Sequence, residues 1–277
     1  MLQFDKVSKI YGPGCGRCLD LTGAGHGRSI CPRCESVVAV NRADLTVKRN
    51  EVLGIVGESG SGKSTLLQLI YRDTTASSGH IYYDGIQERN GAPLDITRAD
   101  RPQERLLRTR TVAMIYQNPR LGLNFDFSAG GNIAEKIIAG GERRYETIRN
   151  RALSSMETIE LPRGRVDDLP EGFSGGQQQR IQIAKALAVG PDLLLLDEPT
   201  TGLDVSVQAR ILDMLRHLQK KMGFAMIIVS HDLGVIRHLT DLCIVVQHGT
   251  IVETGLTDQI MEDPQHPYSQ LLVSSEL

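Results

Sequence analysis

Aromatic residues are scarce in this chain of 277 residues. Tryptophan is absent, and phenylalanine and tyrosine together bring the aromatic share to 4%. Proteins that bind single-stranded nucleic acids stack the bases on aromatic side chains, so this composition argues against such a surface. The formal net charge is −2, which gives no reason to expect broad nucleic-acid binding or a basic membrane patch. We therefore predict no nucleic-acid partner.

Long hydrophobic runs are missing as well. The longest, such as Leu193–Leu196 and Cys243–Val246, are far shorter than the roughly 20 residues of a membrane-spanning helix. Residues 1–6 lack the pattern of a secretory signal. We expect a cytoplasmic protein with one large domain or two modest ones, because 277 residues can bury a sizeable core.

The most informative stretch is residues 57–64, which read G-E-S-G-S-G-K-S. This is the phosphate-binding P-loop pattern, in which backbone N–H groups and the start of a helix surround a polyphosphate. An apolar strand at residues 51–56 and a helix at residues 64–71 give the motif its expected context. Lys63 would reach the β- and γ-phosphates, and Ser64 would ligate Mg²⁺. The residues predicted to bind nucleotide here are Gly57, Ser59, Gly60, Ser61, Gly62, Lys63, Ser64 and Thr65.

Two carboxylates follow a second apolar strand. Residues 193–196 are four leucines, and Asp197 and Glu198 come directly after them. Because α/β sheets bind ligands at the carboxyl ends of their strands, Asp197 can hold Mg²⁺ and Glu198 can orient or deprotonate a water. The alternative is a strand simply capped by acidic residues, and the P-loop in the same chain favours the catalytic interpretation.

Residues 173–177 read F-S-G-G-Q and precede a helix predicted to run to about Val189. A serine hydroxyl and glycine amides at a helix N-terminus form another anion-binding pattern. One polypeptide does not need two such sites for one triphosphate. A head-to-tail dimer does, because each copy can close over nucleotide that the other copy holds. A simple glycine turn is the alternative.

Strands and helices alternate along the chain, which predicts an α/β fold with a parallel sheet and right-handed crossovers. We expect an edge strand at 1–11, a strand at 36–47, a short strand at 78–85, a helix at 95–110 and a strand at 111–117. Residues 118–172 lack strand patterning and predict an inserted helical subdomain. Beyond them we expect a helix at 174–189, strands at 193–196, 225–229 and 242–247, and helices at 205–222 and from 233.

Five motifs in this order resemble the ATP-binding cassette (ABC) family: the P-loop, Phe173–Gln177, Leu193–Glu198, Gly202–Asp204 and His231. The likeness covers nearly the whole chain, although Phe173 replaces the family's usual leucine. It implies an α/β P-loop NTPase fold with a RecA-like parallel-sheet core, an antiparallel β subdomain and an inserted helical subdomain. The implied division is a nucleotide-binding domain at 1–255, which contains the helical subdomain at 118–172, and a C-terminal extension at 256–277.

The same resemblance implies ATP as substrate and Mg²⁺ as its cofactor. Gln117 would contact both Mg²⁺ and the attacking water, and His231 would contact the γ-phosphate. With Glu198, these are the predicted catalytic residues, and Ser64 and Gln117 are the predicted Mg²⁺ ligands. Tyr11 would stack on adenine.

The resemblance also implies a partner, which is a second copy of the chain. Ser174, Gly175 and Gly176 would contact the γ-phosphate held by that copy, and the segment Ser174–Gln177, with Gln177 as a further nucleotide-binding residue, would complete its site. Asp204 would lie at the dimer interface. ATP would therefore bind in a composite site.

Several segments resemble one branch of the family, the K subunits of the carbon–phosphorus lyase system: residues 127–135, 167–170, 202–210, 255–258 and 266–275. That likeness implies an ATPase that docks on the soluble lyase core subunits, which break down phosphonates, and remodels their complex. The tail at 263–272 also resembles ATPases of oligopeptide, dipeptide and nickel importers, whose partners are membrane permeases. The importer is the alternative. A nucleic-acid remodelling cassette would predict tandem cassettes and basic linkers, which this chain lacks.

Four of the five cysteines form two close pairs. Cys15, Cys18, Cys31 and Cys34 have the spacing of a four-thiolate metal site. Zn²⁺ is the predicted ion, in a structural role, because four cysteines leave no open position for catalysis. Rubredoxin-like iron, an iron–sulfur cluster and redox disulfides are the alternatives. The pairs lie in an insert at residues 12–35, where the lyase K subunits have only a short turn. The fifth cysteine, Cys243, is expected to be an inert core residue.

Overall fold

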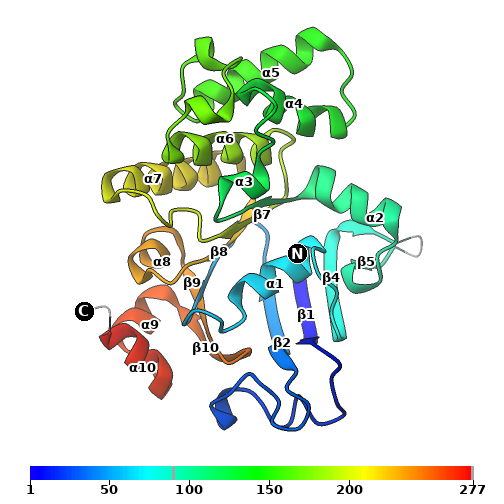
Figure 1. The fold of residues 1–277 in the computed structure, drawn as a ribbon, viewed down its shortest axis with the longest axis vertical. Helices are drawn as coiled ribbons and strands as arrows, with labels where there is room; N and C mark the ends of the chain where they lie inside the picture. Colours follow the sequence, from blue (N-terminus) through cyan, green and yellow to red (C-terminus); the bar gives the residue numbers. More distant parts are fainter. Residues whose placement is uncertain (89–90, 276–277) are drawn as a thin grey trace. The chain divides into compact units, whose positions relative to one another are not determined.

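The structure, a computed structural model, describes residues 1–88 and 91–275. It divides into two compact units, whose helices and strands are labelled in Figure 1. Unit 1 comprises Met1–Glu104 and Ala225–Leu277, and unit 2 comprises Arg105–Phe224. Among the described residues, no helix is long and apolar enough to cross a membrane. Each unit is described in turn.

Unit 1 contains a four-stranded antiparallel sheet. Its strands are β1 (Leu2–Tyr11), β2 (Val37–Val47), β4 (Ser78–Gln87) and β5 (Pro93–Asp95), in the order β2-β1-β4-β5. The prediction of an edge strand at 1–11 is wrong, because β1 pairs with β2 on one side and β4 on the other. The alternation of buried and exposed residues along β1 reports which face is covered, but it does not report how many neighbours the strand has.

A second sheet in unit 1 surrounds the P-loop strand. Its strands are β3 (Val52–Val56), β8 (Ala225–Val229), β9 (Leu242–Gln247) and β10 (Thr250–Leu256), in the order β10-β9-β3-β8. β3 runs parallel to β8 and β9, and every residue of β3 and β8 is buried, which explains their continuous apolar sequences. β10, which the sequence pattern missed, is antiparallel to β9. The helices of this part are α1 (Lys63–Tyr71), α8 (Leu233–Leu239), α9 (Thr257–Glu262) and α10 (Pro267–Ser274).

The helix predicted at residues 95–110 is broken into three short pieces. A 3₁₀ turn covers Ile96–Arg98, α2 covers only Arg101–Leu106, and a π-helical turn covers Leu107–Thr111. Asp95 caps the 3₁₀ turn by accepting a hydrogen bond from the Thr97 amide at 3.0 Å. Pro102 lies in the first turn of α2, the position where proline fits a helix because the missing N–H would have no partner there. The cap and the proline set these boundaries, although the charged sequence pattern predicts one continuous helix.

Unit 2 pairs two parallel strands, β6 (Val112–Ile115) and β7 (Leu193–Asp197), with a set of helices. The helices are α3 (Pro119–Gly122), α4 (Ala129–Ala139), α5 (Tyr145–Thr158), α6 (Gly175–Leu187) and α7 (Val205–Met222). The structure describes every residue of 118–172, and this range contains helices and turns without a strand. Figure 1 shows α4 and α5 against α6.

Candidate functional site

The P-loop in unit 1 depends on glycines at two close approaches. Gly57 has φ 147° and Gly62 has φ 109°, conformations that other residues rarely adopt. A Cβ added to Gly57 would lie 2.1 Å from the Val246 carbonyl oxygen, and one on Gly62 would lie 2.0 Å from that of Ala39. The loop is therefore packed directly against the main chain of β9 and β2. Larger residues at either position would displace the backbone that is predicted to surround phosphate.

Lys63 folds back over its own loop. Its ammonium donates hydrogen bonds to the carbonyls of Gly57 at 2.7 Å and Glu58 at 2.8 Å. Gly62 is the N-cap residue of α1 and has no side chain that could accept from the first amides of the helix. These amides therefore point at the loop. The buried Ser61 hydroxyl has no hydrogen-bond partner among the described residues. These groups fit a triphosphate, which would accept hydrogen bonds from the amides and bring negative charge to Lys63.

Two residues that the sequence patterns did not single out hold the P-loop from outside. The Gly249 amide donates to the Ser61 carbonyl at 2.8 Å, and the Glu58 amide donates to the Tyr268 hydroxyl at 2.9 Å. Tyr268 lies on α10 and is buried, and Gly249 lies in the turn between β9 and β10. No local signal marks either contact, because the partners are separated by about 190 and 210 positions in the sequence.

Tyr11 and His231, the other predicted site residues of unit 1, lie at strand ends. Tyr11 is the last residue of β1 and pairs with Val37, and it is 40% exposed. The ammonium of Lys9 lies 4.7 Å from the Tyr11 ring centroid. His231 is exposed and lies between β8 and α8.

In unit 2 the structure brings two predicted catalytic residues together. The Gln117 side-chain amide donates to a Glu198 carboxylate oxygen at 3.2 Å, and the Thr201 hydroxyl donates to the same oxygen at 3.0 Å. Glu198 follows β7 directly and has a positive φ of 45°. Asp197, the last residue of β7, is half-buried. The carboxyl end of β7 therefore holds a fixed carboxylate beside an amide, as water activation requires.

Gln182 fixes the backbone next to Gln117. From α6, its side chain accepts a hydrogen bond from the Tyr116 amide at 2.7 Å and donates to the Tyr116 carbonyl at 3.2 Å. Gln182 is buried in the structure. In the sequence, the available signal for this anchor was a glutamine within a helical stretch rich in isoleucine and alanine. Two hydrogen bonds thus join α6 to Tyr116, the residue before Gln117.

The predicted anion pattern at residues 174–177 forms a capping box. The Ser174 hydroxyl accepts from the Gln177 amide, and the Gln177 side chain accepts from the Ser174 amide. Ser174 and Gly175 are exposed at the start of α6, whereas Gly176 is buried against Val207. Asp204, also exposed, is the N-cap residue of α7. The exposed serine and the exposed start of α6 fit contact with a second copy of the chain.

The four paired cysteines converge in unit 1. Their sulfur atoms all lie within 4.8 Å of one another. The Cys18 sulfur lies 3.5 Å from that of Cys15 and 3.4 Å from that of Cys34, and the Cys15 and Cys31 sulfurs are 3.7 Å apart. A tetrahedral Zn²⁺ site with bonds of about 2.3 Å places its sulfurs roughly 3.8 Å apart, so the donor set fits this ion.

Two further contacts involve the cysteine sulfurs. The Cys15 amide donates to the Cys18 sulfur at 3.1 Å, and the Cys34 sulfur lies 3.3 Å from the Ser36 hydroxyl. The contact with Ser36 lowers the pKa of the Cys34 thiol to about 6, whereas burial raises the pKa of Cys18 to about 12. Cys243 is buried in β9 with a pKa raised by burial, in agreement with the expected inert core residue.

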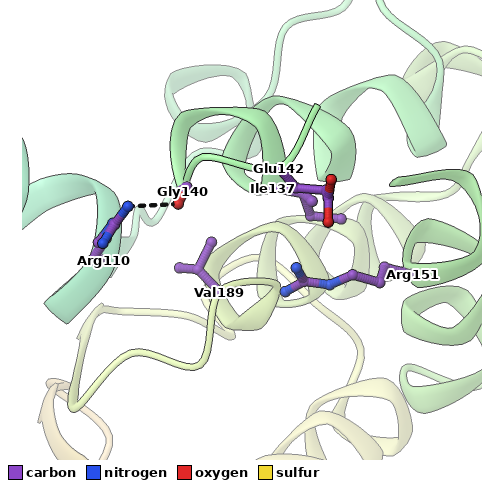
Figure 2. Close-up of a pocket in the computed structure, with 6 residues that line it drawn as sticks. All are labelled: Arg110, Ile137, Gly140, Glu142, Arg151 and Val189. Carbon is purple, nitrogen blue, oxygen red and sulfur yellow. Dashed lines mark hydrogen bonds between the residues drawn. The ribbon is translucent and has the colours of Figure 1, made fainter. Parts of the chain in front are cut away.

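A separate pocket of about 230 Å³ opens within unit 2 (Figure 2). It is lined by Arg110, Ile137, Gly140, Glu142, Arg151 and Val189. Arg110 donates to the Gly140 carbonyl at 2.9 Å, as drawn in Figure 2. None of the predicted nucleotide, catalytic or cysteine residues lines this pocket, so it is distinct from the site assembled above.

Comparisons with known proteins indicate the same family as these motifs. A family profile described as ABC transporter matches residues 40–201, which is more than half of the chain. The chain belongs to the ABC transporter family. The phosphonates utilization ATP-binding protein PhnK of Escherichia coli K12 is 52% identical over 227 residues, which cover 82% of this chain and 87% of that protein.

Two other matches of this ABC ATPase are more distant. The dipeptide transport ATP-binding protein DppF of Escherichia coli K12 is 37% identical over 239 residues, which cover 86% of this chain and 69% of DppF. A solved dimeric ABC cassette, MJ0796 bound to ADP and Pi in a post-hydrolysis state, has a TM-score of 0.76 at 27% identity. That match covers 93% of this chain and 99% of MJ0796. The predicted ABC fold and ATPase activity are thereby confirmed. The roles of single residues stay predictions.

Proposed function

We propose that this ABC ATPase serves phosphonate utilization, as an ATP-driven subunit that docks on soluble carbon–phosphorus lyase core subunits and remodels them. The observation that carries the proposal is the similarity to PhnK, at 52% identity over 87% of that protein. The importer ATPase DppF is 37% identical and is covered to 69%. Both the identity and the matched length therefore favour the phosphonate system.

In this proposal two copies close head to tail on Mg²⁺–ATP. The P-loop residues and His231 hold the phosphates, Tyr11 stacks on adenine, and Ser174–Gln177 of the second copy complete the site. Mg²⁺ supplies charge neutralisation at the phosphates, with Ser64, Gln117 and Asp197 as the residues that would hold it or its waters. Glu198 orients or deprotonates the attacking water. The dimeric MJ0796 cassette with ADP and Pi supports the dimer.

We further propose that the four-cysteine loop binds Zn²⁺ in a structural role and that the protein works in the cytoplasm. The sulfur separations support zinc, as described above. None of the five cysteines forms a disulfide bond, which suits a reducing compartment. The predicted insert at 12–35, the helical subdomain at 118–172 and the extension at 256–277 are the parts we expect to meet partners or brace the nucleotide site.

Affinity capture at native expression tests the proposed partner. A tagged chain carrying Glu198→Gln, with Mg²⁺–ATP present to hold the closed state, is expected to recover soluble lyase core subunits, identified by mass spectrometry. A tagged Lys63→Ala chain, which would bind ATP poorly, serves as the matched control and should recover less. Recovery of membrane permease subunits in place of lyase subunits would overturn the proposal and favour the importer, which the 37% identity to DppF supports.

A further inference from the structure

The four-cysteine loop is physically joined to the P-loop. Both ends of this connection lie in unit 1, and its centre is Asn41 on β2. The Asn41 side-chain amide donates to the loop carbonyls of Leu19 at 2.9 Å and Thr22 at 3.2 Å. Asn41 is 9% exposed, so these bonds are sheltered from water and hold the loop to the strand.

The backbone of Asn41 continues the connection towards the nucleotide. Its amide donates to the Gly249 carbonyl at 2.8 Å, and the Gly249 amide donates in turn to the Ser61 carbonyl at 2.8 Å. Gly62, the next residue of the P-loop, approaches the Ala39 carbonyl of β2 so closely that no Cβ could fit between them. The segment of β2 from Ala39 to Asn41 therefore contacts the cysteine loop on one side and the P-loop on the other.

A second set of contacts reinforces the same junction. Gly23, inside the cysteine loop, has φ 104°, and a Cβ there would lie 2.8 Å from the Thr250 hydroxyl oxygen and 3.2 Å from the Asn41 side-chain nitrogen. The Ala24 amide donates to the Thr250 hydroxyl at 3.4 Å. The cysteine loop thus packs against the β9–β10 turn that supports Ser61, as well as against β2.

The loop also defines the end of the hairpin that carries Tyr11. β1 ends at Tyr11, the cysteine loop follows, and β2 begins at Val37 opposite Tyr11. Ser36 accepts a hydrogen bond from the Gly14 amide at 2.9 Å and contacts the Cys34 sulfur. A loop of this length loses much conformational freedom on closing, and a metal held by four of its side chains offsets that loss.

We propose that a thiophilic divalent cation of the Zn²⁺ type in the four-cysteine loop sets the affinity of the neighbouring site for nucleotide. The metal orders the loop, the loop fixes Asn41 and the β9–β10 turn, and these hold the Ser61–Gly62 backbone and Tyr11 in the arrangement that binds ATP. Removing the metal leaves both sheets of unit 1 in place but releases the P-loop and Tyr11. The inference rests on the proposed zinc site and extends it from a structural staple to a control of ATP binding.

The experiment uses the full chain purified without chelator and without oxygen. Metal content is measured by mass spectrometry, and binding of Mg²⁺–ATP is measured by calorimetry in a Glu198→Gln background that does not turn over. Cys31→Ser is expected to lose the metal and bind ATP about fivefold to tenfold more weakly. Asn41→Ala is expected to keep one metal ion per chain and still bind ATP about fivefold more weakly, because it loses the two sheltered side-chain hydrogen bonds to Leu19 and Thr22.

Asp20→Asn is the matched control. Asp20 lies in the same loop and pairs with Arg42 of the same strand, but both side chains are 53% exposed and neither lies on the path to Ser61. This variant should keep its metal and its ATP affinity. Unchanged ATP affinity in Asn41→Ala, or in metal-free Cys31→Ser, would overturn the inference while the zinc site and the ATPase stood. Absence of metal from the unaltered loop would overturn the zinc proposal and this inference together, with the ATPase assignment intact.

Discussion

At the residue scale, the backbone of Glu198 lies in the left-handed region, with φ 45°. For a residue with a Cβ this conformation costs roughly 1–2 kcal/mol, so the surrounding structure has to hold it. Two side chains, those of Gln117 and Thr201, donate to one oxygen of its carboxylate. These contacts fix the direction of the carboxylate before substrate arrives. A fixed direction is the condition for efficient proton transfer.

Glu198→Gln tests this assignment. The amide keeps the size of the side chain and can accept the same hydrogen bonds, but it cannot take a proton from water. We expect kcat for ATP hydrolysis to fall by about 10²- to 10⁴-fold, with ATP affinity nearly unchanged. Steady-state phosphate release measures the rate. Thr201→Val is the companion variant, which leaves the carboxylate in place and should cost far less. An unaltered hydrolysis rate in Glu198→Gln would remove Glu198 from this role.

At the scale of elements, the sequence predicted best those segments whose pattern is local. The predicted bounds of α7, β8 and β9 agree with the structure, because buried strands read as apolar runs and α7 has an apolar stripe at helical spacing. The short strand β5 and the edge strand β10 were missed. Their residues become strands by pairing with β4 and β9, and that pairing is not written in their own composition.

The same reasoning explains which parts of the site were predicted. The P-loop, the carboxylates after β7 and the cysteine pairs each lie within a few residues, so their spacing carries the chemistry. Asn41, Gly249 and Tyr268 act through partners far away in the sequence, and only the fold brings them to the P-loop.

Tyr268→Phe tests the contact between α10 and the P-loop. The change removes the hydroxyl that accepts from the Glu58 amide and leaves the ring buried. We expect KM for ATP to rise about fivefold with kcat little changed, because one hydrogen bond that orders the loop is lost. Initial rates over a range of ATP concentrations separate the two parameters. Tyr145→Phe, at an exposed tyrosine of α5, is the control, and equal KM values in the two variants would contradict the expectation.

At the scale of the whole molecule, unit 2 presents surface that suits a second copy. Ser174, Gly175 and Asp204 are exposed at the starts of α6 and α7. Next to Asp204, Val205 exposes 84% of its surface, which is unusual for an apolar side chain at a helix start. The predicted anion-binding groups beside an apolar residue fit an interface that closes over phosphate.

Ser174→Arg should block this closure. We expect Glu198→Gln with Mg²⁺–ATP to run as a dimer in size-exclusion chromatography with light scattering, and the double variant with Ser174→Arg to stay monomeric while it still binds ATP. Loss of the serine cap costs about 1 kcal/mol, so thermal unfolding is measured alongside. Ser154→Arg, on the exposed side of α5, is the matched control. A dimer that persists in the Ser174→Arg double variant would refute the head-to-tail arrangement.

The position of the cysteine loop has a consequence for how the protein is made. All four clustered cysteine sulfurs lie between Cys15 and Cys34, and the strand that supports them follows at once in the chain. Their contacts are local, whereas β3 finds its neighbours β8 and β9 only after most of the chain has been translated. Local contacts form early and distant ones late. We therefore expect the proposed metal to load on the emerging polypeptide and to shape the β1–β2 hairpin before the sheet behind the P-loop exists.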